Sequence, residues 1–167
     1  MEGRVYTAAV VTVSDKGYSG EREDVSGRVI VEFLAENAVE TVFKTMVPDE
    51  AADIKKALID ACGKNVDLVL TTGGTGFSKR DITPEATMEV IEREASGISE
   101  AVRYYSLQIT PRAMLSRGVS GIRGESLIVN LPGSPKAVKE ALGFILESLK
   151  HGMDILKGSA ADCARKD

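Results

Sequence analysis

Apolar residues gather in short segments along the chain, and these segments predict strands. Residues 5–13 (VYTAAVVTV) are β-branched and almost continuously apolar, which is typical of a strand buried on both faces of a parallel sheet. The other segments are also short and rich in β-branched residues, and Pro48 ends the second of them. The strands expected on these grounds cover residues 5–13, 40–47, 66–72, 118–123 and 126–131.

Helices are expected between these strands, where apolar residues recur every three or four positions. Thr83 precedes Pro84 and is expected to cap one helix, while Ser134 and Pro135 open the last and longest one. No strand is expected between the third helix and the fourth. The expected helices cover residues 26–38, 49–62, 83–93, 97–108 and 134–156.

Strands that alternate with helices along the whole chain predict an α/β fold. We expect a three-layer α/β/α sandwich with a mainly parallel sheet. The length of 167 residues suits one domain, which we assign to residues 1–157, with residues 158–167 as a flexible tail. In such folds ligands bind beyond the carboxyl ends of the strands, where the strand order reverses.

Composition narrows the classes of function. A net charge of -4 argues against nucleic acid as a partner, and no apolar run approaches the roughly 20 residues that cross a membrane. Cys62 and Cys163 are the only cysteines, and the single His151 cannot complete a zinc site with them. The scarcity of cysteine and the lack of a signal-like N-terminus predict a cytoplasmic protein.

Three polar segments that contain glycine follow expected strands, so we expect them to share one rim of the sheet. They cover residues 14–24, 71–81 and 131–135. In residues 71–76 (TTGGTG), glycine lets backbone N–H groups approach an anion closely. The spacing fits neither a P-loop nor a dinucleotide-binding fingerprint. A phosphate cradle and a tight turn against the next helix are both open at this point.

Charged residues of both signs lie on or near these segments. Asp81 is a candidate ligand for Mg²⁺, and its structural alternative is a carboxylate that stabilises a helix entry. The pattern around Asp49 favours a helix N-cap. Lys16, Lys79 and Arg80 are candidate phosphate ligands, although loop cations are more often solvated.

The chain offers no pairing of a nucleophile with a general base. His151 is the only histidine and lies late in the last expected helix, so neither a Ser-His-Asp nor a Cys-His arrangement is available. Phosphoryl or nucleotidyl transfer needs no protein nucleophile, because positioning and charge stabilisation carry most of the catalysis. These reactions are therefore favoured.

Three ordered motifs together resemble the MogA family of molybdenum cofactor biosynthesis, to which the G domain of gephyrin is related. They are residues 71–76 (TTGGTG), 80–87 (RDITPEAT) and 130–137 (NLPGSPKA). The resemblance extends from residue 10 through the last helix. It implies a MogA-like fold and a molybdopterin adenylyltransferase, which transfers AMP from ATP to the terminal phosphate of molybdopterin with Mg²⁺ and releases pyrophosphate. It also implies a homotrimer and a MoeA-like molybdenum insertion protein as a partner.

The resemblance assigns roles to particular residues. It makes Asp49 and Asp81 the catalytic and metal-binding aspartates, which replaces the cap interpretation of Asp49 with a functional one. Ser116 resembles a position that faces the pterin. The remaining binding residues implied by the resemblance are Ser14 and Asp15 at the rim, Gly73, Gly74, Thr75 and Gly76 around the nucleotide phosphates, and Pro132, Gly133 and Ser134 on the adenosine side.

Two other interpretations stay open. The first is a paralogue resembling MoaB, which has the same fold; residues 110–117 (TPRAMLSR) and 81–84 (DITP) favour MogA over it. The second is a module that binds molybdopterin or holds a partner without catalysis. Retention of both Asp49 and Asp81 favours an enzyme, because a pure binder has less need for them.

Overall fold

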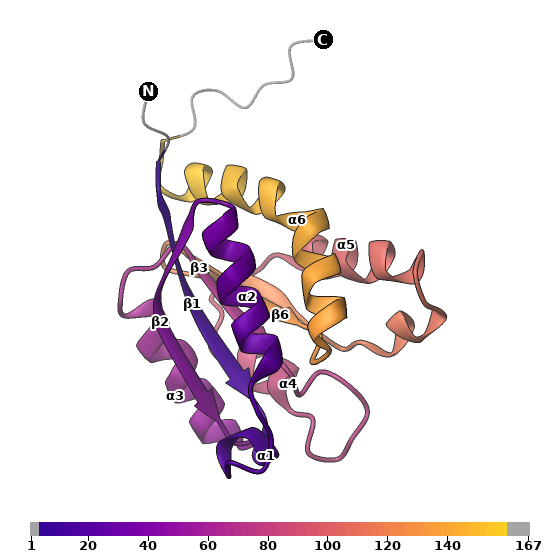
Figure 1. Cartoon of the computed structure of the whole chain (residues 1–167). Helices are drawn as coiled ribbons and strands as arrows, with labels where there is room; N and C mark the ends of the chain where they lie inside the picture. The colour runs from indigo at the N-terminus through magenta and orange to yellow at the C-terminus, as the bar shows by residue number, and fades with distance from the viewer. Residues whose placement is uncertain (1–3, 160–167) are drawn as a thin grey trace.

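A computed structural model describes residues 4–159 and contains one six-stranded sheet in the order β2-β1-β3-β6-β5-β4 (Figure 1). The pairs β1–β2, β1–β3 and β3–β6 are parallel, and β5 pairs antiparallel with both β6 and β4. The strands are β1 (Tyr6–Val13), β2 (Val39–Val47), β3 (Leu68–Thr72), β4 (Arg93–Glu94), β5 (Ser120–Arg123) and β6 (Ser126–Leu131).

Helices cover both faces of this sheet. Helix α2 packs beside α6, which also contacts α5, and these three share one hydrophobic core; α3 contacts α4 and belongs to a second core (Figure 1). The helices are α1 (Asp15–Tyr18), α2 (Val25–Glu36), α3 (Ala51–Cys62), α4 (Thr83–Met88), α5 (Ser96–Leu107) and α6 (Pro135–Leu156), with a 3₁₀ helix η1 (Pro111–Leu115).

The two cores follow from the alternation of side chains along each strand. In β1, Ala8 and Val10 contribute to the core shared with α2 and α6, whereas Ala9 and Val11 contribute to the core shared with α3. All four are fully buried. The central strands thus face apolar layers on both sides, which is why they read as continuous apolar runs. The predicted three-layer α/β/α sandwich with a mainly parallel sheet is confirmed.

The expected helix over residues 83–93 is wrong at its end, and so is the expectation that no strand follows it. Helix α4 stops at Met88, and residues 93–94 form β4. The backbone N–H of Glu92 donates to the carbonyl of Ile122, and that of Ala95 donates to the carbonyl of Ser120. Pairing with the free edge of β5 therefore outweighs continuation of the helix, because it satisfies backbone groups at both ends of the segment.

Two other expectations concern the C-terminal tail and membrane-spanning helices. Of the expected tail, residues 160–167 lie outside the described residues, while the N–H of Ser159 donates to the Asp154 carbonyl at the end of α6. Within residues 4–159, none of the helices combines the length and the apolar character that crossing a membrane requires.

Candidate functional site

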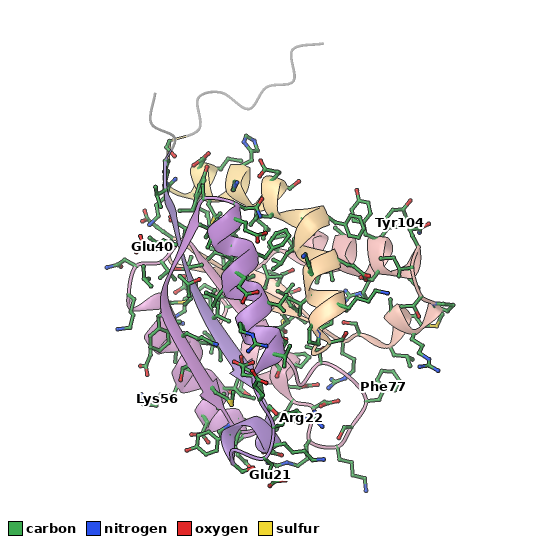
Figure 2. The ribbon with its side chains drawn as sticks, viewed as in Figure 1. Glu21, Arg22, Glu40, Lys56, Phe77 and Tyr104 are labelled. Atoms are coloured by element: carbon green, nitrogen blue, oxygen red, sulfur yellow. The ribbon has the colours of Figure 1, made fainter. Side chains whose placement is uncertain are left out.

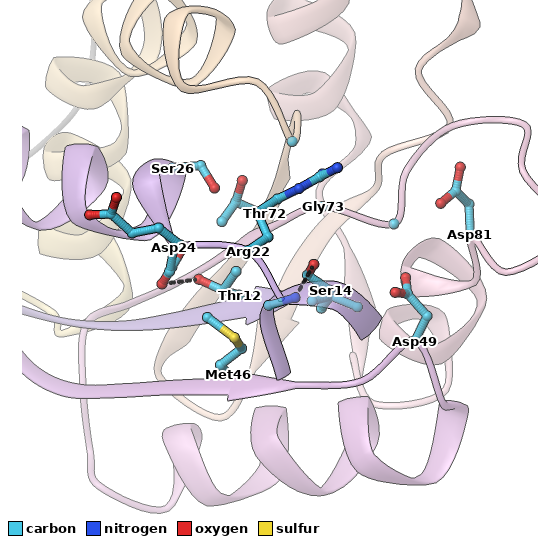
Figure 3. Close-up of a pocket in the computed structure, with 15 residues that line it drawn as sticks. Thr12, Ser14, Arg22, Asp24, Ser26, Met46, Asp49, Thr72, Gly73 and Asp81 are labelled. Carbon is cyan, nitrogen blue, oxygen red and sulfur yellow. Dashed lines mark hydrogen bonds between the residues drawn. The ribbon is translucent and has the colours of Figure 1, made fainter. Parts of the chain in front are cut away.

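A cavity of about 240 Å³ opens beyond the carboxyl ends of β1, β2 and β3 (Figure 3). The strand order reverses here, because β1 lies between β2 and β3, and this is where ligands bind in open α/β sheets. The three loops expected to share one rim all reach the cavity. Its lining includes Thr12, Ser14, Arg22, Glu23, Asp24, Ser26, Met46, Asp49, Thr72, Gly73, Gly74, Asp81 and Gly133.

The backbone conformation and close packing of the glycine loop after β3 leave no room for side chains at two of its positions. Gly73 and Gly74 have φ angles of +96° and +68°, in the left-handed region. A Cβ atom on Gly73 would lie 2.3 Å from the carbonyl oxygen of Val13, and one on Gly74 would lie 2.3 Å from Oγ1 of Thr83. The loop is therefore a tight turn packed closely against the start of α4, which is one of the two alternatives that the sequence left open.

Thr83 does not cap its helix, which corrects that prediction. Ile82 occupies the cap position, and its side chain makes no capping bond. The hydroxyl of Thr83 instead donates to the Gly73 carbonyl at 3.0 Å, and its backbone N–H donates to the Gly74 carbonyl at 3.1 Å. The start of α4 thereby holds both glycine carbonyls.

A buried polar network joins the strand and the helix on either side of the same loop. The amide of Asn130 in β6 donates to the hydroxyls of Thr71 and Thr87, each at 3.0 Å, and the Thr87 hydroxyl donates to the Thr83 carbonyl at 2.8 Å. All of these residues are buried. Such a satisfied network rigidifies the strand ends and the helix that position the glycine loop.

Asp49 lines the cavity and does not cap α3, so the cap interpretation is wrong. Glu50 is the cap residue, without a side-chain capping bond. The Asp49 carboxylate instead accepts the backbone N–H of Asp15 at 2.9 Å, and the Asp15 carboxylate accepts the N–H of Asp49 at 3.0 Å. This reciprocal pair joins the loops after β1 and β2. Burial raises the pKa of Asp49, and the charges of Asp15 and Asp81 add to this effect.

The side chain of Arg80 binds the Asp15 carboxylate of this pair. Its guanidinium donates two hydrogen bonds to the Asp15 carboxylate, at 2.9 and 3.0 Å, and one to Glu50 at 2.8 Å. These bonds lower the pKa of Asp15 and raise that of Arg80. Arg80 is thus engaged by carboxylates rather than free for phosphate, and Lys16 and Lys79 are exposed and do not line the cavity.

Asp81 lies at the end of the loop that the glycines begin, and Arg117 holds this loop in place. The carboxylate of Asp81 accepts the N–H of Ser78 at 3.0 Å. The guanidinium of Arg117 donates to the carbonyl of Gly76 at 2.7 Å and to that of Asp81 at 2.5 Å, while its backbone N–H donates to the Thr75 carbonyl at 2.9 Å. No pattern in the sequence singled out Arg117, because its partners lie about forty positions away.

The polar segment after β1 is not simply a loop, since it contains the short helix α1. Ser14 caps this helix by accepting the N–H of Gly17 at 3.0 Å (Figure 3). The cap places Ser14 at the cavity wall and points the following chain toward Asp49. Asp15 does not itself line the cavity but holds Asp49.

The remaining sequence-predicted residues divide between two places. Gly133 reaches the cavity, and a Cβ on it would lie 3.5 Å from the Cα of Gly73. Ser134 caps α6, as expected, by accepting the N–H of Ala137. Pro132, whose carbonyl accepts the Thr72 hydroxyl at 2.6 Å, and Ser116 line a separate cleft of about 210 Å³ between α5, η1 and α6. The structure therefore brings six of the twelve predicted site residues to the main cavity, and Ser116 and Pro132 to a second cleft.

Sequence reasoning missed several residues of the cavity wall. Thr12 donates a hydrogen bond to Asp24 at 3.0 Å, and Asp24 also caps α2 and pairs with Lys44 at 3.4 Å (Figure 3). Arg22 also lines the cavity. Arg22 and Asp24 lie in the long polar segment after β1, which signalled a functional loop but no individual side chain, whereas Thr12 lies in β1 itself.

Comparisons with known proteins agree with this geometry. A family model described as "Probable molybdopterin binding domain" matches residues 9–151. The chain is 43% identical to the molybdopterin adenylyltransferase of Helicobacter pylori over 154 residues, which cover 90% of this chain and 87% of that protein.

Solved structures give the same result. The chain is similar to the molybdopterin biosynthesis enzyme MoaB from Thermus thermophilus, with 47% identity, a TM-score of 0.86 and coverage of 92% of this chain and 97% of that one. It is also similar to the molybdopterin biosynthesis Mog protein from Mycobacterium ulcerans, with 36% identity, a TM-score of 0.84 and coverage of 90% and 99%. The likeness thus extends to both Mog and MoaB proteins.

Proposed function

Because the chain belongs to the family of probable molybdopterin-binding domains, we propose that it is a molybdopterin adenylyltransferase that works in molybdenum cofactor biosynthesis. An oxygen of the terminal phosphate of molybdopterin bonds to the α-phosphorus of ATP. The bond from that phosphorus to the bridging oxygen breaks, and pyrophosphate leaves. The observation that carries the proposal is the single cavity that joins a glycine loop to two aspartates at the switch point of the sheet.

The glycine loop is suited to hold the nucleotide phosphates. Its carbonyls are taken up by Thr83, and within residues 4–159 no protein acceptor takes up the N–H of Gly73 or Gly74. Free N–H groups on a backbone with positive φ form a concave anion site. Thr75 and Gly76 extend the loop, and Arg117 fixes their carbonyls. We assign Gly133 and its neighbours Pro132 and Ser134 to the adenosine side, and Ser116 to the pterin side.

Asp49 and Asp81 fit a bound Mg²⁺. Both line the cavity, both supply hard oxygen ligands, and their charges interact. In the part of the chain that the structure describes, no group of three or more His, Cys, Asp or Glu side chains is placed to hold a metal alone. Two carboxylates plus substrate phosphate oxygens is the set that Mg²⁺ usually takes. When bound, the ion neutralises charge that develops on the phosphate oxygens.

The chain's own residues then have to position the reactants rather than activate them. The attacking phosphate oxygen is largely ionised at neutral pH, because the second pKa of a phosphate monoester is about 6. No general base is needed, which agrees with a cavity lined by hydroxyls, glycines and carboxylates. Rigid support of the loop by Asn130 and Arg117 keeps the phosphates in line.

We also propose that the protein is a cytoplasmic homotrimer that hands its product to a MoeA-like insertion protein. An apolar surface on α5, η1 and α6 supports self-association. Tyr105 stacks on Phe144 with ring centroids 4.7 Å apart, and Tyr104 lies at the outer surface (Figure 2). Light scattering coupled to size exclusion gives the mass; a monomer would contradict the trimer and leave the reaction unaffected.

The test of the reaction is incubation of the purified protein with molybdopterin, ATP and Mg²⁺, beside a reaction with the metal chelated. We expect adenylylated molybdopterin and pyrophosphate in equal amounts, and only with the metal. The likeness to a MoaB protein supports a second candidate, a paralogue that binds the pterin without this transfer. Tight binding of molybdopterin without product would favour the paralogue or a non-catalytic binding module.

A further inference from the structure

The charges around the main cavity do not match a polyanionic substrate. Four of its lining residues are acidic, namely Glu23, Asp24, Asp49 and Asp81, and among the described lining residues Arg22 is the only cation. ATP and molybdopterin both bring phosphate groups to this cavity under the proposed function. Phosphates near several carboxylates need a nearby positive charge to offset repulsion.

Lys16 and Lys79 are exposed and do not line the cavity, and the other cations near it are already engaged by the protein. Arg80 binds Asp15 and Glu50, Arg117 binds two loop carbonyls and pairs with Glu85, and Lys44 pairs with Asp24. Releasing any of these cations for a substrate would leave a carboxylate or a loop without its partner. They are therefore poor candidates for phosphate ligands.

Arg22 differs from them in a specific way. Its backbone N–H donates to the Lys16 carbonyl at 3.1 Å, next to the N–H of Glu21, which donates to the same carbonyl at 2.9 Å. These bonds anchor the main chain of Arg22 at the end of the turn that follows α1. Across residues 4–159, its guanidinium makes no hydrogen bond and lies within 4.0 Å of no carboxylate. Figure 3 shows the side chain reaching into the cavity beside Thr72.

From this arrangement we propose that Arg22 binds a phosphate group of the substrate. The proposal rests on the proposed function, since it assigns a role within the same cavity. A guanidinium offers paired donors that match two phosphate oxygens and keeps its charge at every working pH. Hydroxyls of Ser14 and Ser26 line the same wall and can donate further hydrogen bonds. The phosphate has two possible sources, the triphosphate of ATP and the terminal phosphate of molybdopterin.

Calorimetric titration with inorganic pyrophosphate, with ATP and with molybdopterin, each in the presence of Mg²⁺, distinguishes these sources. We compare the wild type with Arg22→Met and Arg22→Lys. The control is Lys56→Met, which removes another exposed positive charge, on the outer face of α3 and away from the cavity lining (Figure 2). Thermal melting of each variant verifies that it is folded.

We expect Arg22→Met to lower the affinity for at least one of these ligands by about 10-fold or more, which is the usual effect of losing a charge-assisted pair. Arg22→Lys should recover part of the loss, because it keeps the charge but not the paired donors. Loss toward ATP and pyrophosphate assigns Arg22 to the triphosphate, and loss toward molybdopterin alone assigns it to the pterin substrate.

Wild-type affinity of Arg22→Met for all three ligands would overturn the inference while leaving the proposed function standing. Equal losses in Arg22→Met and Lys56→Met would overturn it as well, because the effect would then come from net charge. Failure of the wild type itself to bind either ATP or molybdopterin would instead contradict the proposed function.

Discussion

The two ends of β3 carry aspartates in opposite situations. Asp67 precedes the strand, has a side chain only 6% exposed, and accepts hydrogen bonds from Arg4 at 2.6 Å and from the N–H and hydroxyl of Thr7 at 2.9 and 3.2 Å. Asp81, which follows β3, and Asp49, which follows the neighbouring β2, line the cavity at the opposite, carboxyl edge of the sheet. Each of these two carboxylates accepts one backbone N–H from within residues 4–159.

The difference separates a carboxylate that holds the fold from one that is available to a ligand. At Asp67 both oxygens are occupied by protein donors, and Lys157 lies 3.9 Å away. At Asp49 the pKa is raised by burial and then by neighbouring carboxylates, so the folded protein disfavours its charge. Such a group is stabilised only when a cation arrives, which is the property expected of a metal-binding site.

The largest effect is expected from Asp81→Asn. The substitution keeps the shape of the side chain and removes its charge, so we expect adenylyl transfer to fall by about 100-fold or more while the protein stays folded. Product formation and thermal melting measure the two properties. Asp60→Asn, an exposed position on α3, is the matched control and should keep full activity. Full activity in Asp81→Asn would remove Asp81 from the mechanism.

The opposite outcome is expected at the other end of β3. Asp67→Asn removes one of the two carboxylates that pair with Arg4, the other being Asp154, and removes an acceptor at a buried position, which should lower the free energy of unfolding by about 2 kcal/mol. Denaturant unfolding measures the loss. The rate per folded molecule should match the wild type, and a selective loss of rate in a fully stable variant would contradict the comparison.

A smaller effect is expected from Arg117→Met. Arg117 touches carbonyls of the loop that carries Asp81, not the substrate, so its loss should loosen the loop and lower the rate by about 10-fold. Magnesium affinity should fall with it, whereas Arg93→Met, at an exposed position in β4, should change neither. Unchanged magnesium affinity would show that Arg117 does not position Asp81.

The smallest effect is expected in the pH dependence of magnesium binding. The pKa of Asp49 is raised and that of Asp15 is lowered, so Asp49 takes up its proton before Asp15 as the pH falls into the acid range. Magnesium binding to the wild type should weaken in this range, and Asp49→Asn should bind weakly with little pH dependence. Titration with Mg²⁺ at a series of pH values measures this.

The same shift has a consequence for stability. A folded-state pKa above the unfolded value means that the contribution of this group to stability is present at low pH and is lost as the pH rises through the folded pKa. Asp49→Asn should therefore melt above the wild type at neutral pH, and the difference should shrink under acid conditions. A lower melting temperature for Asp49→Asn at neutral pH would contradict the raised pKa.

Much of the fold was predictable because hydrophobic period and turn residues are local properties. The segments around β1, β3 and α6 stand out in the sequence, since their apolar residues follow the spacing of buried strands and of an amphipathic helix. The errors occurred where a distant partner decides the outcome. β4 forms because the edge of β5 is available for pairing. Thr83 does not cap its helix because its hydroxyl donates to the carbonyl of Gly73, ten residues earlier in the chain.

The candidate site shows the same division. The glycine loop and Asp81 were predictable from short motifs. The local pattern around Asp49 favoured a helix cap, and only the family resemblance pointed to a functional role; its contact with Asp15, 34 residues away, has no local signal. Arg22 and Arg117 had no local signal, because a cation in a polar loop is ordinary in sequence. Arg22 lines a cavity without a carboxylate partner, and Arg117 binds loop carbonyls. Both environments exist only after the chain has folded.

Residue type and spacing along the chain were enough for the layered α/β class, the family and the order of the main strands and helices, although not for β4. Only the tertiary structure decided which carboxylates are held by the protein and which face the cavity. The reason is that desolvation, pairing and hydrogen bonding depend on groups that folding brings together from 30 or more positions apart.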